Sequence, residues 1–297
     1  MVAAGNSNAE SSGKKDRREA AREKARLDRE LEKRRARRNR GFLQGGIGII
    51  VLAIVAIVAL VIVNQPPPPS AVGPKNMLSD GILFRGANLD AVTTAAITAN
   101  GKPVVTSTST PAVPARIVIY LDYQCPYCAQ FESTNSAHIA ALVKQGTATL
   151  EVHPISFLDN SSGSNRYSTR SANAAACVAN YQPNNFLAVS AALYANQPGE
   201  NAGGKTDAQL ISVLTGAGSG SAEIQSCIKA EKFGTWVAAA SNRLDPGGKS
   251  NVFAGVAKTP QPFAGTPSVF VNGIKYPGSI TDAAVFAAFV SAQQAAS

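Results

Sequence analysis

The chain is 297 residues long, with 45% hydrophobic residues and a formal net charge of +9, which allows one large domain or two small ones. The positive charge is concentrated at one end: residues 1–41 hold 14 Lys and Arg against 7 Asp and Glu, whereas the remainder holds 14 against 12. A nucleic-acid-binding surface on the folded part is therefore not expected. For the basic tail we favour solvated chain or attraction to anionic lipid over nucleic-acid binding.

An uncharged apolar segment follows this tail. Residues 42–63 run for 22 residues without a charge and are rich in Ile, Val, Ala and Leu. A helix of that length spans about 30 Å, the thickness of the hydrocarbon core of a bilayer, so we predict a single-pass anchor in the cell membrane. Lys and Arg crowd its N-terminal flank, which predicts that residues 1–41 are cytoplasmic and that the chain after Val63 is extracytoplasmic. A cleaved signal peptide is the alternative, although its apolar core is normally shorter and its basic leader briefer.

The sequence then predicts a linker and the first part of a mixed α/β domain over residues 76–297. Residues 64–75 contain four consecutive prolines and are expected to be extended and semi-rigid. Further elements follow from apolar patterning. They are short outer strands near residues 81–84 and 104–105, a buried strand over 116–121, a helix with Phe131, Asn135, His138 and Leu142 at helical spacing, and a second strand over 149–153.

A helical insertion and a return to β structure complete the domain. Ala-rich helical patterns occupy about residues 157–250, interrupted by prolines and glycines. Residues 268–271 and 274–276 then flank Asn272-Gly273, a strong signal for a β-hairpin. Thr281 is predicted to cap a final helix, on one face of which lie Val285, Phe286, Phe289 and Val290.

The motif Cys125-Pro126-Tyr127-Cys128 directly follows the buried strand. A strand that passes into a helix there places Cys125 at the helix N-terminus, where unpaired backbone N–H groups and the helix dipole favour a thiolate. Because a thiolate is the species that attacks disulfides, the motif indicates thiol–disulfide exchange. A zinc half-site and a structural disulfide are the alternatives.

A second pair, Cys177 and Cys227, lies on helical patterns of the insertion. All four cysteines fall on the predicted outer side of the membrane, where disulfides form and persist. We interpret this pair as an inert structural disulfide, whose loop would give about 4 kcal/mol of stabilisation. Two buried free thiols, or a second redox pair that passes electrons to Cys125 and Cys128, are the alternatives. A four-cysteine zinc site is disfavoured because only one CxxC half-site is present, and neither a metal nor a cofactor is expected.

Two motifs of this chain, and the order in which they occur, resemble the DsbA-like branch of the thioredoxin superfamily, especially its membrane-anchored bacterial members. They are residues 122–128, Asp-Tyr-Gln-Cys-Pro-Tyr-Cys, followed by Phe131-Glu132, and residues 265–273, Gly-Thr-Pro-Ser-Val-Phe-Val-Asn-Gly. The resemblance covers about residues 105–297 and implies an α/β thioredoxin-like fold with a helical insertion.

The resemblance also implies roles for individual residues. Cys125 would be the exposed attacking cysteine and Cys128 the buried resolving cysteine, with Pro267 as a cis-proline that faces both. A cis bond at Pro267 would expose the backbone of Thr266, so that an extended substrate could pair with it. An ordinary trans-proline at the start of a strand is the alternative.

At one position the chain departs from this family. Six residues before the first cysteine, many members carry a buried acidic residue that helps proton transfer, but this chain has Ile119. Asp122 either relays protons in its place or orients the loop. Glu132 is expected to be an exposed helix carboxylate rather than a catalytic group, and His153 a structural histidine rather than a site residue.

The function implied by the resemblance is an extracytoplasmic, membrane-anchored thiol–disulfide oxidoreductase that introduces disulfides into secreted or envelope proteins. Its substrates would be unfolded or reduced secreted proteins, and a quinone-linked membrane oxidase of the DsbB or vitamin K epoxide reductase-like kind would reoxidise it. A disulfide isomerase or reductase of the same fold is one alternative, because these enzymes differ mainly in redox potential. A non-enzymatic thioredoxin-like binding module is another, although the intact cysteine pair argues against it.

Overall fold

The computed structural model describes residues 72–99, 101–106, 114–160, 165–199, 202–244, 256–259 and 263–296. Backbone contacts divide the chain into two units, residues 1–68 and 69–297, and every described residue belongs to the second unit. None of the helices within these ranges is long and apolar enough to cross a bilayer. The predicted anchor at residues 42–63 and the basic tail lie outside the described residues.

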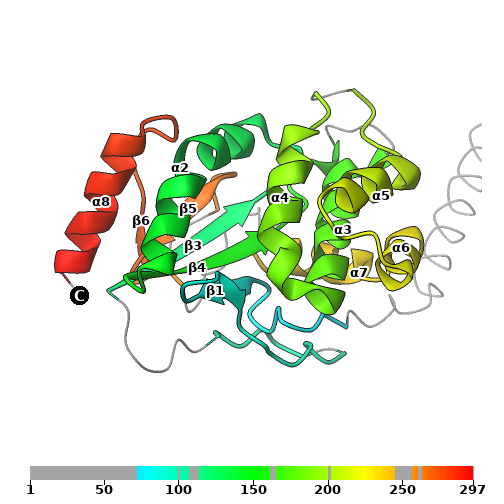
Figure 1. Ribbon diagram of the computed structural model, residues 1–297, viewed down its shortest axis with the longest axis horizontal. Coiled ribbons are helices and arrows are strands. Elements are labelled where there is room, and N and C mark those ends of the chain that lie inside the picture. Colours follow the sequence, from blue (N-terminus) through cyan, green and yellow to red (C-terminus); the bar gives the residue numbers. More distant parts are fainter. Residues whose placement is uncertain are drawn as a thin grey trace, which may run out of the picture. The chain divides into compact units, whose positions relative to one another are not determined.

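Two parallel strands form the centre of a six-stranded sheet with the order β2-β1-β4-β3-β5-β6 (Figure 1). They are β3 (Ala115–Leu121) and β4 (Ala148–Pro154), paired so that Ile119 lies opposite Val152. Every residue of β4 is buried, and only Arg116 of β3 is not fully so. Strands covered on both faces become continuous apolar runs, which explains why the sequence predicted both strands to within one residue at each end.

Antiparallel strands extend the sheet on both sides. β1 (Ile82–Arg85) pairs with β4 and with the short β2 (Asp90–Ala91), while β5 (Ser268–Val271) pairs with β3 and with β6 (Ile274–Lys275). The turn between β5 and β6 is Asn272-Gly273, with φ values of 51° and 81°. Both residues adopt the left-handed conformation that a two-residue hairpin turn requires, and Asn and Gly tolerate it best. The predicted strand near 104–105 is wrong: no strand forms there within the described residues, and the Val104 N–H only donates one bond to Leu78.

Helices α2 (Pro126–Lys144) and α8 (Ala283–Ala295) pack against each other on one face of the sheet. The Phe131 and Phe286 rings meet edge to face, with centroids 5.3 Å apart. The predicted cap of α8 is corrected, because Asp282 rather than Thr281 accepts the backbone N–H groups of Ala284 and Val285. Val285 is 44% exposed, so it does not share the buried face with Phe286 and Val290.

The helical insertion lies between β4 and β5 and forms a group of helices beside α2 (Figure 1). A disulfide joins Cys177 to Cys227, with the Cα atoms 5.9 Å apart, and so connects two helices of the group. The helices of the insertion, with a 3-10 turn at Pro183–Asn185, are α3 (Tyr167–Tyr181), α4 (Phe186–Ala195), α5 (Asp207–Gly216), α6 (Ala222–Lys229) and α7 (Gly234–Arg243).

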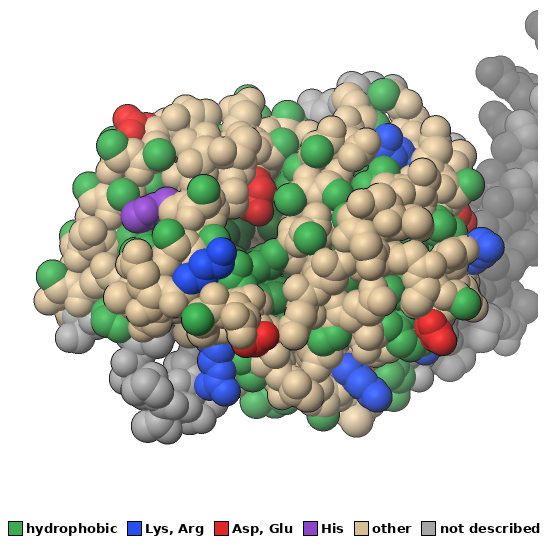
Figure 2. All heavy atoms as spheres, in the orientation of Figure 1, with side chains coloured by type: hydrophobic (Ala, Val, Ile, Leu, Met, Phe, Trp, Pro, Cys, Tyr) green, Lys and Arg blue, Asp and Glu red, His purple; other side chains and the backbone are tan. Residues whose placement is uncertain are grey.

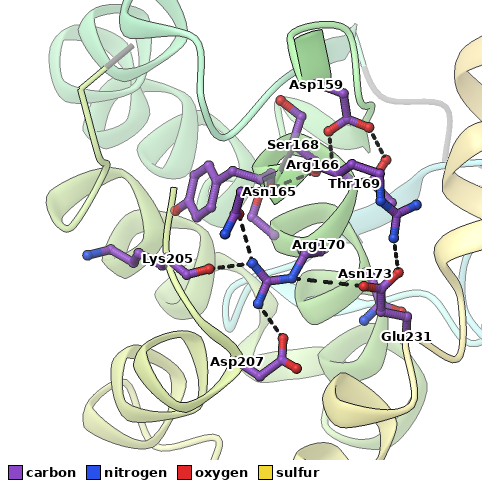
Figure 3. A network of polar contacts seen from close by, with 12 residues as sticks. Asp159, Asn165, Arg166, Ser168, Thr169, Arg170, Asn173, Lys205, Asp207 and Glu231 are labelled. Atoms are coloured by element: carbon purple, nitrogen blue, oxygen red, sulfur yellow. Dashed lines mark hydrogen bonds and ion pairs between the residues drawn. The ribbon is translucent and has the colours of Figure 1, made fainter. Parts of the chain in front are cut away.

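A polar network fixes the start of α3 against later parts of the insertion (Figure 3). The Arg170 guanidinium donates to Asn165 and to the Lys205 carbonyl, and it pairs with Asp207 at the start of α5. Its Nε lies 3.9 Å from Glu231, in the turn between α6 and α7. One planar, multidentate cation thus holds three chain segments together, residues 165–170, residues 205–207 and the turn at Glu231.

Candidate active site

The first turn of α2 carries both thiols of the CxxC motif. Cys125 is the N-cap residue and Pro126 follows at the first helical position, where a missing N–H loses no helical bond. The N–H groups of Cys128 and Ala129 donate to the Cys125 carbonyl, at 3.1 and 3.2 Å, and close the first turn. Both Cys125 and Cys128 are free thiols.

The loop before β5 brings Thr266 and Pro267 to these thiols. The Thr266–Pro267 peptide bond is cis. In its protonated form the Cys125 thiol donates a hydrogen bond to the Thr266 carbonyl at 3.3 Å, although 141 residues separate the two in sequence. The antiparallel pairing of β5 with β3 positions this loop, because Ser268 lies opposite Tyr120, just before the CxxC turn.

The expectation that Cys125 is exposed is wrong for this structure, since only 3% of the residue is accessible, the same fraction as for Cys128. The Thr266 carbonyl contacts its sulfur, and Cys125 belongs to the main hydrophobic core. The exposed part of the motif is Tyr127, which is 60% accessible. A polypeptide therefore meets Tyr127 at the surface before it meets the sulfur.

The two thiols differ sharply in acidity. A hydrogen bond from Cys128 is the largest contribution that lowers the pKa of Cys125 to about 6. Burial opposes this shift, while Thr266 and the backbone N–H groups of Cys128 and Tyr127 add to it. Burial raises the pKa of Cys128 well above its ordinary value. At neutral pH the pair therefore presents one thiolate, on Cys125, and one thiol.

The Asp122 carboxyl is fully buried next to the motif and has a structural task. Its two oxygens accept the N–H groups of Gln124 and Leu158, each at 2.8 Å, so it ties the CxxC turn to the segment after β4. Burial, with a smaller contribution from the charge of Cys125, raises the pKa of Asp122 to about 6, although the hydrogen bonds that its carboxylate accepts oppose this shift. The carboxyl orients the loop, and its protonation is coupled to that of Cys125.

Helix α4 supplies contacts that the sequence did not reveal. The Gln197 side chain, just beyond α4, donates to the carbonyls of Tyr123 and Cys125 at 2.8 and 3.1 Å. The Tyr194 hydroxyl donates to the Asp122 carbonyl at 3.3 Å. About 70 residues separate these partners in sequence, so no local pattern could have indicated them.

Neither Glu132 nor His153 belongs to the group of residues around the two thiols. Glu132 is half-buried rather than exposed, because it lies in a hollow between α2 and α4. His153 is buried, stacks on Tyr120 and lies 3.3 Å from Glu151. It therefore belongs to the face of the sheet that is opposite to α2. Any side chain at Gly81 would collide with its ring.

Comparison with known protein families shows which family the chain belongs to. Residues 109–289 match the Thioredoxin family. The chain belongs to this family. Among curated proteins, the serine/threonine-protein kinase PknE of Mycobacterium tuberculosis is 32% identical over 164 residues, which cover 54% of this chain. The match covers only 28% of the kinase, so the activity in its name is a property of that longer protein.

Solved structures of thioredoxin-family members agree with the fold. Oxidised DsbA of Mycobacterium tuberculosis superposes with a TM-score of 0.52 at 25% identity, covering 72% of this chain and 92% of that one. BdbD from Bacillus subtilis, 16% identical, superposes with a TM-score of 0.52 and covers 77% of this chain and 100% of that one, which supports the fold alone. The mixed α/β fold with a helical insertion is thus confirmed, and the similarity to DsbA supports the predicted enzyme class, a DsbA-like thiol–disulfide oxidoreductase.

Proposed function

We propose that the chain is a membrane-anchored, extracytoplasmic oxidase that introduces disulfides into reduced secreted or envelope proteins through Cys125 and Cys128. The observation that carries the proposal is the contrast between the two thiols, because the pKa of Cys125 is lowered to about 6 and that of Cys128 is raised. A stabilised thiolate makes the reduced enzyme favourable and the disulfide form a good oxidant.

The reaction starts from the enzyme with a Cys125–Cys128 disulfide. A substrate thiolate attacks Cys125, the enzyme disulfide breaks, and Cys128 leaves with the electron pair and takes up a proton. A second substrate thiolate then attacks the substrate sulfur of the mixed disulfide and releases the Cys125 thiolate. The substrate loses two electrons and the enzyme gains them, so an external oxidant must restore the enzyme disulfide.

The contact between the Thr266 backbone and the Cys125 sulfur supports a role for Thr266 in substrate binding. We propose that an extended substrate pairs with this backbone. A quinone-linked membrane oxidase of the DsbB or vitamin K epoxide reductase-like kind is the proposed external oxidant, and an anchor at residues 42–63 would hold the chain close to it.

Refolding of reduced, unfolded ribonuclease by the full-length chain tests the activity. Disulfide formation is expected with the wild-type chain and not with Cys125→Ser. Absence of activity from both chains would favour a non-enzymatic binding role, whereas activity that survives in Cys125→Ser would show that Cys125 is not the attacking residue. Equilibration with glutathione measures the redox potential of the cysteine pair, which determines the direction of the reaction. We expect a redox potential well above thioredoxin's value of about −270 mV, and a value near it would indicate a reductase.

A further inference from the structure

A concave site lies between α2, α4 and the sheet. Figure 2 shows this hollow near the centre of the view, with hydrophobic side chains along it. It consists of two cavities of about 230 and 410 Å³ that share Glu132, Ser136 and Ala191 in their linings. The floor of the smaller cavity is apolar and is formed by Ile119, Leu121, Ile139, Leu150 and Val152.

Glu132 is the one charged side chain among the residues that line the two cavities. Within the described part of the chain it makes no hydrogen bond and no ion pair. Burial alone raises its pKa to about 7, with no contribution from a neighbouring charge. The carboxyl group is thus partly removed from water and receives no compensating cation or donor, which is unfavourable for its ionised form.

No basic side chain lines the hollow around Glu132: Arg85 of β1, and His138 and Lys144 of α2, are not among the lining residues. Helix α4 contains no Lys, Arg, Asp or Glu. Its Tyr194, like Tyr123 behind it, stays neutral because burial raises the pKa of both hydroxyls far above neutral. On α2, Cys128 lies one turn before Glu132 and stays protonated. On β2, Asp90 follows the lining residue Leu89, and its carboxylate accepts a hydrogen bond from Asn184.

We propose that this hollow binds a small apolar amine, whose ammonium group pairs with Glu132 while its aliphatic or aromatic body fills the apolar floor. Charge complementarity identifies the occupant, because an unpaired carboxylate in an apolar hollow is compensated by a cation that brings apolar surface with it. The 230 Å³ floor cavity is smaller than the usual range of about 300–1,000 Å³ for drug-sized ligands, which fits a compact molecule. Neither Cys125 nor Cys128 lines the site, so the inference is independent of the redox function.

Isothermal titration calorimetry of the full-length chain in lipid nanodiscs tests the proposal, with chain-free nanodiscs as the blank. The probes are phenethylamine, its neutral analogue 2-phenylethanol and its anionic analogue phenylacetate. At pH 8, where Glu132 is ionised, we expect the amine to bind at least about tenfold more tightly than the alcohol, since a charged pair at a partly buried site is favourable by 1.4 kcal/mol or more. Phenylacetate is expected to bind most weakly.

Variants locate the effect. Glu132→Gln keeps the size of the side chain and should abolish the preference for the amine while the alcohol still binds. Glu223→Gln, on the exposed side of α6, is the matched control and should behave like the wild-type chain. Ala191→Phe, at the exposed mouth that both cavities share, should block all three probes without disturbing the core.

Proton linkage gives an independent readout. An amine bound to Glu132 favours the carboxylate, so binding at pH 7 should release on the order of half a proton, and amine affinity should rise between pH 5 and pH 8. Buffers of different ionisation enthalpy measure this release, which Glu132→Gln should remove. The proposal is overturned if the amine does not bind at millimolar concentration, if amine and alcohol bind equally, or if Glu132→Gln leaves the preference intact.

Discussion

At the scale of single residues, the reactivity of Cys125 depends on the groups around its sulfur. The sequence predicted the helix N-terminus correctly, because a buried strand followed by Cys-Pro is a local pattern. It predicted a role for the backbone of Thr266 but not for its side-chain hydroxyl, which lowers the pKa of both cysteines and so favours their thiolate forms. It also left Asp122 open, since only the folded structure shows the two N–H groups that its carboxylate accepts.

Thr266→Val tests the contribution of this hydroxyl. The variant keeps the shape of the side chain and the backbone carbonyl but removes the O–H, so the pKa of Cys125 should rise by about one unit. The pH dependence of the rate of Cys125 alkylation by iodoacetamide measures the shift. Thr281→Val, at an exposed position, should leave the profile unchanged. An unchanged profile in Thr266→Val would show that the hydroxyl does not act on the thiolate.

At the scale of elements, local patterns and long-range contacts differ in how well the sequence reveals them. β3, α2, β4 and the Asn272-Gly273 hairpin follow from apolar runs and turn chemistry, which are local. The contacts of α4 with the CxxC turn are not local, and the sequence gave no indication of them. Local signals also misled, both at residues 104–105, where no strand forms within the described residues, and at the start of α8, where Thr281 matched the capping preference as well as the adjacent Asp282.

The disulfide between α3 and α6 is expected to act on stability rather than on catalysis. Cys177 and Cys227 are 50 positions apart, so their bond restricts the unfolded chain and should contribute about 4 kcal/mol. Urea unfolding without reductant should show this loss in Cys177→Ala/Cys227→Ala, while ribonuclease oxidation at 25 °C should persist. A variant as stable as the wild-type chain would show that the bond does not restrain the insertion.

The carboxyl of Glu132 should make stability depend on pH. Burial raises its pKa from 4.5 to about 7, so its contribution to stability is fully present below pH 4.5 and is lost as the pH rises through 7. Glu132→Gln should therefore be about as stable as the wild-type chain at pH 5. At pH 8 it should be more stable, by about 1–2 kcal/mol after allowance for partial solvent screening. Equal differences at both pH values in urea unfolding would contradict this effect.

At the scale of the whole molecule, charge and hydropathy predict different roles for the two ends of the chain. The basic tail accounts for most of the net charge of +9, and the part from residue 69 onward holds all four cysteines. The fold of that part could be predicted from the sequence because two separate motifs, at residues 122–128 and 265–273, occur in the order that the resembled family shows. The anchor and its orientation stay predictions.

Fractionation tests the anchor. The full-length chain should stay with membranes after extraction at alkaline pH, and deletion of residues 1–63 should release it into the soluble fraction. In intact cells, a membrane-impermeant maleimide should label Cys125 after mild reduction, because the domain is predicted to be extracytoplasmic. Labelling only after the cells are lysed would reverse the predicted orientation.

The most direct test of the account is a titration of the Cys125 thiolate in the reduced full-length chain, followed by its absorbance near 240 nm. Cys125→Ser serves as the reference from which the signal of this one sulfur is obtained by difference. The structure predicts half-ionisation at a pH of about 6, with a transition that is missing in Cys125→Ser. A transition near pH 9, the value of an ordinary thiol, would contradict the assignment of Cys125 as the attacking residue.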